Sequence, residues 1–178
     1  TDESTLQTSV PHIFAAGDVC HDTFLSSVAI QEGKFAGRNA ACYPNFVNKP
    51  KQVKVNIVYT DPILAIVGYS LEEMRQYAKL TGDNFITTDV HLSQGHYRGL
   101  REDGGILSID TSISTHQILG AELCAYKGDK IANFLALAME NNYTVERLAD
   151  YSYNNLSSES AIGVAAKEAI IRLEKNRL

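Results

Sequence analysis

Residues 59–68 read YTDPILAIVG, and this stretch determines the architecture of the chain around it. It predicts a strand that ends near Tyr59, a turn at Asp61-Pro62 and a second short strand that ends at Gly68. Just before it, apolar and polar residues alternate over residues 53–57, the period of a strand with one face buried. The stretch therefore starts a series of strands.

Strands come first in this part of the chain and helices come after them. Three more strands are predicted, and a capping box at Ser70 and Glu73 opens a helix that runs to about Lys79. Three helices are predicted after the last strand, two of them long with apolar stripes and a short one capped by Thr144. The connections are too short for repeated βαβ crossovers, so we expect an α+β fold with an antiparallel sheet flanked by helices. The further strands are predicted over residues 85–92, 105–110 and 117–125, and the long helices lie along the stripes at 131–139 and 162–173.

The first 47 residues have a different organisation. The apolar run Ile13–Ala16 predicts a buried strand that closes in a Gly17-Asp18 turn, and a helix is expected from about Ser27, its N-cap, to Cys42. Residues 43–51 have the composition of a connector. We therefore expect two domains, residues 1–47 and 48–178, with the boundary near Asn48.

Composition excludes several classes of protein. The chain has 178 residues and a net charge of −5, which argues against nucleic acid as a partner. Its longest apolar run, Phe134–Met139, is too short to cross a membrane. Three widely spaced cysteines form no metal-binding pattern and predict reduced, mostly packed thiols of a cytoplasmic protein. Because the chain starts at Thr1 without Met or a leader, we expect it to be a fragment.

Two stretches near the N-terminus have residue types suited to binding a ligand. Residues 8–19 read TSVPHIFAAGDV, in which small residues and Gly17 let a ligand approach the backbone and Asp18 can accept a hydrogen bond from a sugar-like hydroxyl. The alternative is an ordinary strand and turn. Residues 27–33 read SVAIQEG and begin a helix, whose N–H groups favour negative charge.

These two stretches and residues 59–68 resemble, in the same order, motifs of the pyridine nucleotide-disulfide oxidoreductase family, and the resemblance covers nearly the whole chain. It implies that residues 1–47 are the end of an FAD-binding domain and residues 48–178 the interface, or dimerisation, domain. Asp18 would bind a ribitol hydroxyl of FAD, with Val28 and Ala29 at the flavin ring. The implied activity, most similar to the lipoamide dehydrogenase branch, passes electrons from NAD(P)H through flavin to a disulfide or another acceptor.

The sequence departs from the family at the expected catalytic segment. Disulfide-reducing members have H-P-T-x-x-E before the last helix, with the His as acid/base and the Glu orienting it. Here residues 151–159 read YSYNNLSSE, so the His position falls on Asn154 and the Glu on Glu159, or on Ser160 if the last helix is aligned instead. Some branches have a Tyr in this segment, which makes Tyr153 or Tyr151 a candidate hydroxyl donor. The alternative is a pair of interface tyrosines.

Other parts of the family pattern are absent from the chain. It has no C-x-x-x-x-C pair, no G-x-G-x-x-G for the FAD pyrophosphate and no NAD(P)-binding domain. We therefore expect the chain alone to be inactive and to bind no FAD, and we keep as an alternative an interaction module that has lost redox activity. We expect a homodimer, because the family's interface domain buries apolar surface and the stripe of the last helix, Ile162–Leu173, is too wide for one small sheet.

Overall fold

The computed structural model of the chain describes residues 1–20, 25–50, 52–92, 104–154 and 156–176. The described residues form two compact units, Thr1–Gln52 and Val53–Leu178. That the first unit is the end of an FAD-binding domain stays a prediction. In the described part of the chain no helix is long and apolar enough to cross a membrane.

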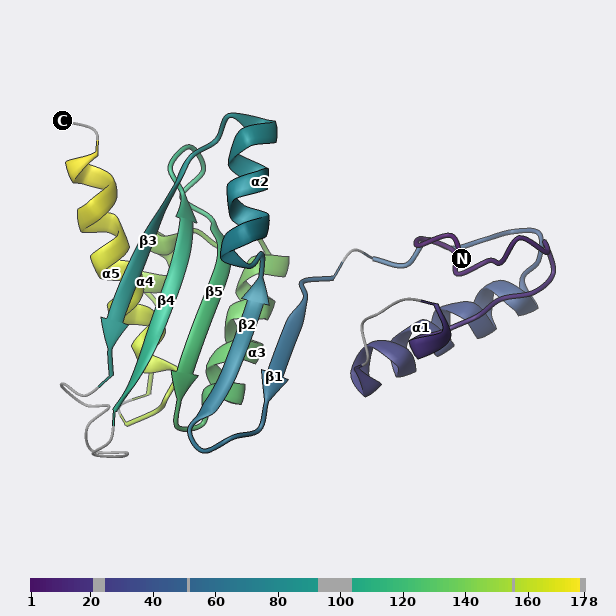
Figure 1. Cartoon of the computed structure of the whole chain (residues 1–178), viewed down its shortest axis with the longest axis horizontal. Helices are drawn as coiled ribbons and strands as arrows, with labels where there is room; N and C mark the ends of the chain where they lie inside the picture. The colour runs from purple at the N-terminus through teal and green to yellow at the C-terminus, as the bar shows by residue number, and fades with distance from the viewer. Residues whose placement is uncertain (21–24, 51, 93–103, 155, 177–178) are drawn as a thin grey trace. The chain divides into compact units, whose positions relative to one another are not determined.

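The second unit is built on a five-stranded antiparallel sheet with the order β1-β2-β5-β4-β3 (Figure 1). The motif at residues 59–68 forms the turn between the first two strands and all of the second. Apolar residues of β1 and β2 that alternate along the strands face the core, with Ala65 and Val67 buried. The strands are β1 (Val55–Val58), β2 (Ile63–Gly68), β3 (Phe85–His91), β4 (Gly105–Ser112) and β5 (Ile118–Ala125).

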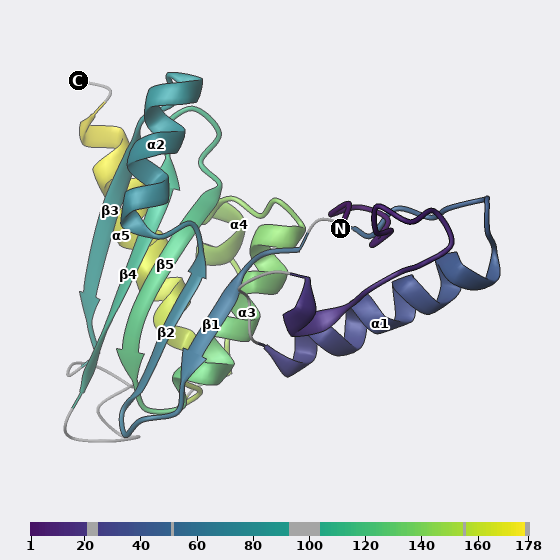
Figure 2. The ribbon, with the colours of Figure 1, turned by 45° about the vertical axis from the view of Figure 1, so that its right-hand side comes forward.

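Helices α3 (Gly128–Glu140), α4 (Val145–Ala149) and α5 (Ser160–Lys175) lie on one face of this sheet (Figures 1 and 2). Both predicted stripes pack there: Leu135 and Ile162 are fully enclosed, and the half-buried members pack against the same core. The half-buried members are Phe134, Met139 and Ile170. Thr144 caps α4 by accepting a hydrogen bond from the Arg147 N–H, as predicted. The arrangement confirms the α+β class with an antiparallel sheet flanked by helices.

Helix α2 (Leu71–Thr81) lies on the other side of the sheet, where it contacts β5 (Figure 2). The predicted capping box is present: the Ser70 Oγ accepts from the Glu73 N–H, and the Glu73 carboxylate accepts from the Ser70 N–H at 2.9 Å. The Ser70 backbone and the Lys54 ammonium lower the pKa of Glu73 to about 2. These interactions fix the start of α2 directly after the sheet motif.

The prediction that the stripe of α5 leaves apolar surface for a dimer is wrong. The stripe residues Ile162 and Leu173, and the alanines between them, are buried within the unit, because α5 packs against β3, β4 and α4 together. Ile170 is half-buried and packs against the same core. The exposed apolar side chains of the sheet lie on the opposite face, at Val58, Leu64 and Ile66. Any apolar surface that drives association must therefore be sought outside this stripe.

The first unit consists of a short 3-10 helix η1 (Gly17–Val19), the helix α1 (Ser26–Ala41) and the segments around them. The predicted buried strand Ile13–Ala16 is wrong: Phe14 makes a single bridge to Gln7, and Ile13 is 47% exposed. The physical reason is that the described residues of this unit offer no further strand to pair with the run. Ser27 lies inside α1 and is not its N-cap, which is Leu25.

Candidate functional site

Gly17 places the predicted flavin-binding loop against α1. It is buried and has a φ of +78°, a conformation that favours glycine. A Cβ atom at this position would lie 3.1 Å from the Cβ of Ala29. A side chain at this position would be strained in φ and crowded against Ala29, so glycine suits the close approach of the loop to α1. The structure thus brings the predicted residues Asp18 and Ala29 into one neighbourhood.

The other predicted cofactor-binding residues lie at the same end of α1. Asp18 is exposed within η1, and Val28 and Ala29 are half-buried in the first turn of the helix. The N-cap residue, Leu25, has no side-chain group that could cap this helix start. Because N–H groups of a first turn have no partner within the helix, they favour a negatively charged or hydrogen-bond-accepting ligand. The role of these three residues remains a prediction that this arrangement fits.

Glu32 is a residue of this region to which the sequence interpretation gave no role. It is fully buried, and its Oε2 accepts a hydrogen bond from the Gly17 N–H at 3.0 Å while its Oε1 pairs with the Lys49 Nζ at 2.6 Å. Glu32, Ala36 and Asn39 form one buried helix face. These three residues have the spacing of one helix face, but two of them are polar. Apolar periodicity in the sequence therefore does not reveal this buried face.

The second candidate region is the segment before α5, where aromatic rings gather. The ring centroids of Tyr151 and Tyr153 are 4.9 Å apart, and both rings contact Phe134. The Tyr153 ring also lies against Gly163, where a Cβ atom would meet it at 2.7 Å. Its hydroxyl is buried without a hydrogen-bond partner in the described part of the chain, and burial, with Tyr151 adding to it, raises the pKa of Tyr153. Within this chain Tyr153 packs as an aromatic residue.

The second catalytic candidate, Glu159, is half-buried and accepts a hydrogen bond from the Ser158 Oγ at 3.0 Å. Asn154, predicted to stand at the position of the family's His when the segment is aligned through Glu159, is exposed. A histidine–carboxylate pair does occur in the unit, between His116 before β5 and Glu146 in α4, with Nδ1 2.5 Å from Oε1. Burial acts against the charged form of Glu146, but hydrogen bonds from His116 and Thr144 lower its pKa. This pair joins the β4–β5 turn to α4, and neither partner belongs to the segment 151–159.

Replacing Tyr153 by Phe tests the packing role. Because the buried hydroxyl has no partner in the described residues, its removal should leave the free energy of unfolding unchanged or raise it by about 1 kcal/mol. Urea denaturation of this chain measures the change, with Tyr151→Phe at the neighbouring exposed ring as the control. A loss of about 1 kcal/mol or more in Tyr153→Phe alone would show that the hydroxyl has a partner.

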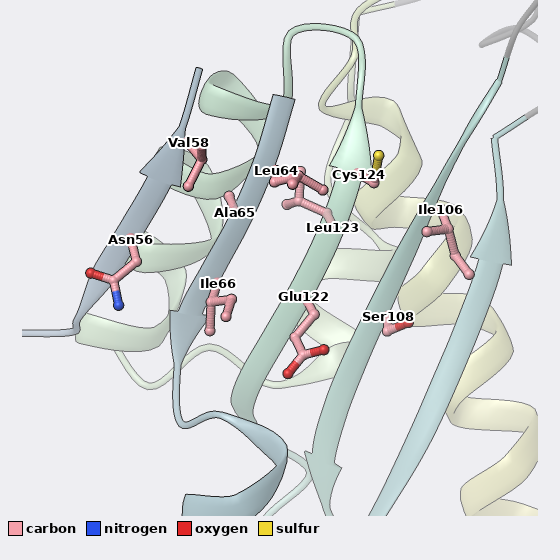
Figure 3. Close-up of a pocket in the computed structure, with 10 residues that line it drawn as sticks. All are labelled: Asn56, Val58, Leu64, Ala65, Ile66, Ile106, Ser108, Glu122, Leu123 and Cys124. Atoms are coloured by element: carbon pink, nitrogen blue, oxygen red, sulfur yellow. The ribbon is translucent and has the colours of Figure 1, made fainter. Parts of the chain in front are cut away.

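The sheet face opposite α3 and α5 forms an open groove (Figure 3). Leu64 and Ile66 of β2 and Ile106 of β4 give it apolar walls, and Ser108 and Glu122 are polar groups of its lining. The Ser108 Oγ donates to the Asp89 Oδ1 at 2.7 Å. Ser108 is thus engaged with a carboxylate that lies on an edge strand of the sheet.

The side chains that could bind a metal ion are dispersed in the described part of the chain. Across the described ranges, no three side chains of His, Cys, Asp or Glu come together closely enough to hold a metal ion. Cys20, Cys42 and Cys124 are free, as predicted for reduced thiols. The expectation that they are mostly packed is wrong, since Cys42 is exposed and the other two are half-buried. Cys42 lies at the C-terminal end of α1, and Cys124 faces the groove.

Known proteins show the same domain. The sequence family "Pyridine nucleotide-disulphide oxidoreductase, dimerisation domain" matches residues 55–166, more than half of the chain. A mercuric reductase from Shewanella putrefaciens is 26% identical over 91% of this chain and 28% of its own length. A dihydrolipoyl dehydrogenase from Geobacillus stearothermophilus is 31% identical over 80% of this chain and 29% of its own length.

Solved structures share the fold. The HOCl-induced flavoprotein disulfide reductase RclA from Escherichia coli superposes with a TM-score of 0.78 at 18% identity, over 92% of this chain and 37% of its own. A NAD-dependent persulfide reductase from A. fulgidus gives 0.76 at 19% identity, over 97% of this chain and 34% of its own. The chain spans about a third of the length of the curated relatives it matches.

Proposed function

Because the chain belongs to the pyridine nucleotide-disulphide oxidoreductase family and contains its dimerisation domain, we propose that it is the C-terminal dimerisation region of an FAD-dependent oxidoreductase. The full-length protein passes electrons from NAD(P)H through flavin to a disulfide or another acceptor. Dihydrolipoyl dehydrogenases and mercuric reductases are among the relatives that support this proposal. We also propose that it is cytoplasmic, which its free cysteines support.

The observation that carries the flavin assignment is the contact between the Gly17-Asp18 loop and the start of α1. Gly17 has a positive φ and packs closely on Ala29, so the loop lies directly on the first turn of α1. The Asp18 side chain next to it is exposed and can accept a hydrogen bond from a ribitol hydroxyl. FAD bound there would supply the electron acceptance and donation, and the chain's own residues would bind and orient it.

Asp18→Ala in the full-length flavoprotein is expected to lower FAD retention by about tenfold or more. A hydrogen bond to a carboxylate contributes about 1.5–3 kcal/mol, and its loss weakens binding by that factor. The ratio of flavin to protein absorbance after gel filtration measures retention. Glu3→Ala, which removes another exposed carboxylate from the first unit, is the control and should retain flavin. Unchanged flavin content in Asp18→Ala would show that Asp18 is only a turn residue.

The chain alone is expected to be inactive and colourless, because loop and helix-start contacts without a pyrophosphate site are too few to hold FAD. The alternative is an interaction module that has lost redox activity, which Asn154 at the position of the family's His favours. The colour of the full-length protein separates the two. Flavin absorbance supports the oxidoreductase, and a colourless preparation supports the interaction module.

Self-association is the function proposed for the second unit by itself. Its match to a dimerisation domain supports this, as do the exposed apolar side chains of Val58, Leu64 and Ile66. We expect a homodimer of this chain in sedimentation equilibrium at tens of micromolar, the order of magnitude for a weak association. A monomer at every concentration up to that range would contradict the expectation.

A further inference from the structure

Glu32 is a charged side chain in a place where charge is costly. It lies in the middle of α1 and is fully buried. Carboxylates are almost never fully buried unless a cation and hydrogen-bond donors compensate the lost hydration. Its partners should therefore show what the buried charge does.

Those partners come from different parts of the first unit. The Gly17 N–H of the predicted flavin-binding loop donates to Oε2 at 3.0 Å, and the Lys49 Nζ of the connector pairs with Oε1 at 2.6 Å. Only 19% of the Lys49 side chain is exposed, so this ion pair is shielded from solvent. One carboxylate thus fastens the loop and the connector to the same helix.

The contact with Gly17 matters because Asp18 is the next residue in the chain. Gly17 has the positive φ that sets the direction of the loop at this point. A hydrogen bond to the Gly17 N–H holds the Ala16–Gly17 peptide plane, and the chain continues from it through the Gly17 Cα to Asp18. Displacement of this plane would move the Asp18 carboxylate relative to the start of α1.

Asn39 shows that the contact is specific to Glu32. It is also fully buried, two turns further along α1 on the same face. Its side chain donates to the Thr5 and Val47 carbonyl oxygens and accepts from the Val47 N–H at 2.8 Å. It therefore holds the same unit together without any of these bonds reaching Gly17.

We infer that Glu32 is a positioning residue for flavin binding: its buried carboxylate fixes Gly17 and thereby holds Asp18 in place to accept the ribitol hydroxyl. The inference rests on the proposed flavin contact of Asp18. Lys49 has the supporting role of neutralising the carboxylate.

Two double variants of the full-length flavoprotein isolate the hydrogen bond from the charge. Glu32→Gln with Lys49→Met removes both charges but keeps a side-chain oxygen that can accept from the Gly17 N–H. Glu32→Leu with Lys49→Met removes both charges and the acceptor. Neither variant leaves an unpaired buried charge, the change that would most endanger folding.

Flavin content per folded protein and the apoprotein melting temperature are measured for both variants. The Gln variant is expected to retain flavin within about twofold of the wild type, and the Leu variant to lose about tenfold, the same loss as Asp18→Ala. Asn39→Ala should lower the melting temperature but retain flavin. Where the Leu variant does not fold, Glu32→Ala with Lys49→Met takes its place, because it also removes the acceptor and both charges.

Equal flavin content in the Gln and Leu variants would overturn the inference. So would a flavin loss in Asn39→Ala as large as that of the Leu variant, because loss of stability alone would then explain it. If Asp18→Ala loses flavin and the Leu variant does not, the proposed function stands and the role of Glu32 fails. If Asp18→Ala itself retains flavin, the proposed contact is wrong and the inference falls with it.

Discussion

Oxidation of dihydrolipoamide by the full-length flavoprotein is expected to be weak or absent, about 100-fold or more below that of a relative with a titratable base in the catalytic segment. In the alignment through Glu159, Asn154 takes the place of that base, and an amide side chain cannot titrate. A tyrosine ordinarily titrates near 10, and burial raises the pKa of Tyr153 further. Glu159 accepts a hydrogen bond from Ser158, and no histidine lies in the segment.

The measurement pairs two half-reactions of the same preparation. Reduction of the flavin by NAD(P)H should proceed, because it needs no protein base in this segment, whereas dihydrolipoamide and glutathione disulfide should turn over poorly. Acceptors that need no base, such as quinones, oxygen or a metal ion, are the expected remaining substrates. Tyr153→Phe should leave these rates unchanged, and a large loss would make its hydroxyl a proton donor. Robust dihydrolipoamide oxidation by the wild type would require a base from elsewhere in the dimer and would contradict the prediction.

Gly68→Ala is expected to lower the free energy of unfolding of the second unit by about 3 kcal/mol or more. Gly68 ends the motif at residues 59–68 and has a φ of +71°. A Cβ atom there would lie 2.5 Å from the Leu119 carbonyl oxygen and 2.9 Å from the Met139 Sδ. The carbonyl cannot easily yield, because it already accepts a hydrogen bond from the Tyr69 N–H at 3.0 Å. The strain of a positive φ and the clash with a backbone carbonyl therefore both destabilise the Ala variant.

Gly82→Ala is the matched control for this prediction. Gly82 has a nearly equal φ of +74°, but nothing lies within 4 Å of the position of its Cβ. It should cost about 1 kcal/mol, the strain of a positive φ alone. Chemical denaturation of both variants, compared with the wild type, gives the difference due to the clash. Equal losses in the two variants would show that the sheet moves to accept the methyl group.

The elements that could be predicted from the sequence are those in which an apolar pattern and a local signal agree. The second unit offers such agreement throughout: the capping box at Ser70 precedes a helix, and the stripe from Ile162 to Leu173 is buried as a helix. The extent of that burial could not be predicted, because periodicity shows which side chains share a face but not how many elements cover it. Here α4 joins the sheet in covering α5.

The first unit is harder to predict because polar contacts between distant segments define it. Ile13 and Phe14 have the composition of a buried strand, yet apolar composition does not supply a neighbouring strand. Glu32 and Asn39 are polar residues of the kind found on a solvated helix face, yet both are buried. Each forms hydrogen bonds with residues far away in the sequence. Burial of a polar side chain depends on its partner, which the local sequence does not reveal.

The strand order β1-β2-β5-β4-β3 has a consequence for synthesis on the ribosome. The hairpin of β1 and β2 is complete once Gly68 has emerged, but the inner edge of β2 pairs with β5, which begins at Ile118. At about 5–20 residues per second, the roughly 50 residues between them take several seconds to appear. During that interval the nascent hairpin has an unpaired edge beside Leu64 and Ile66. When β5 arrives, it pairs with β2 and β4 and joins the two halves of the sheet in one step. A translation pause before β5 would therefore prolong the period in which the unpaired edge can bind chaperones or misassemble.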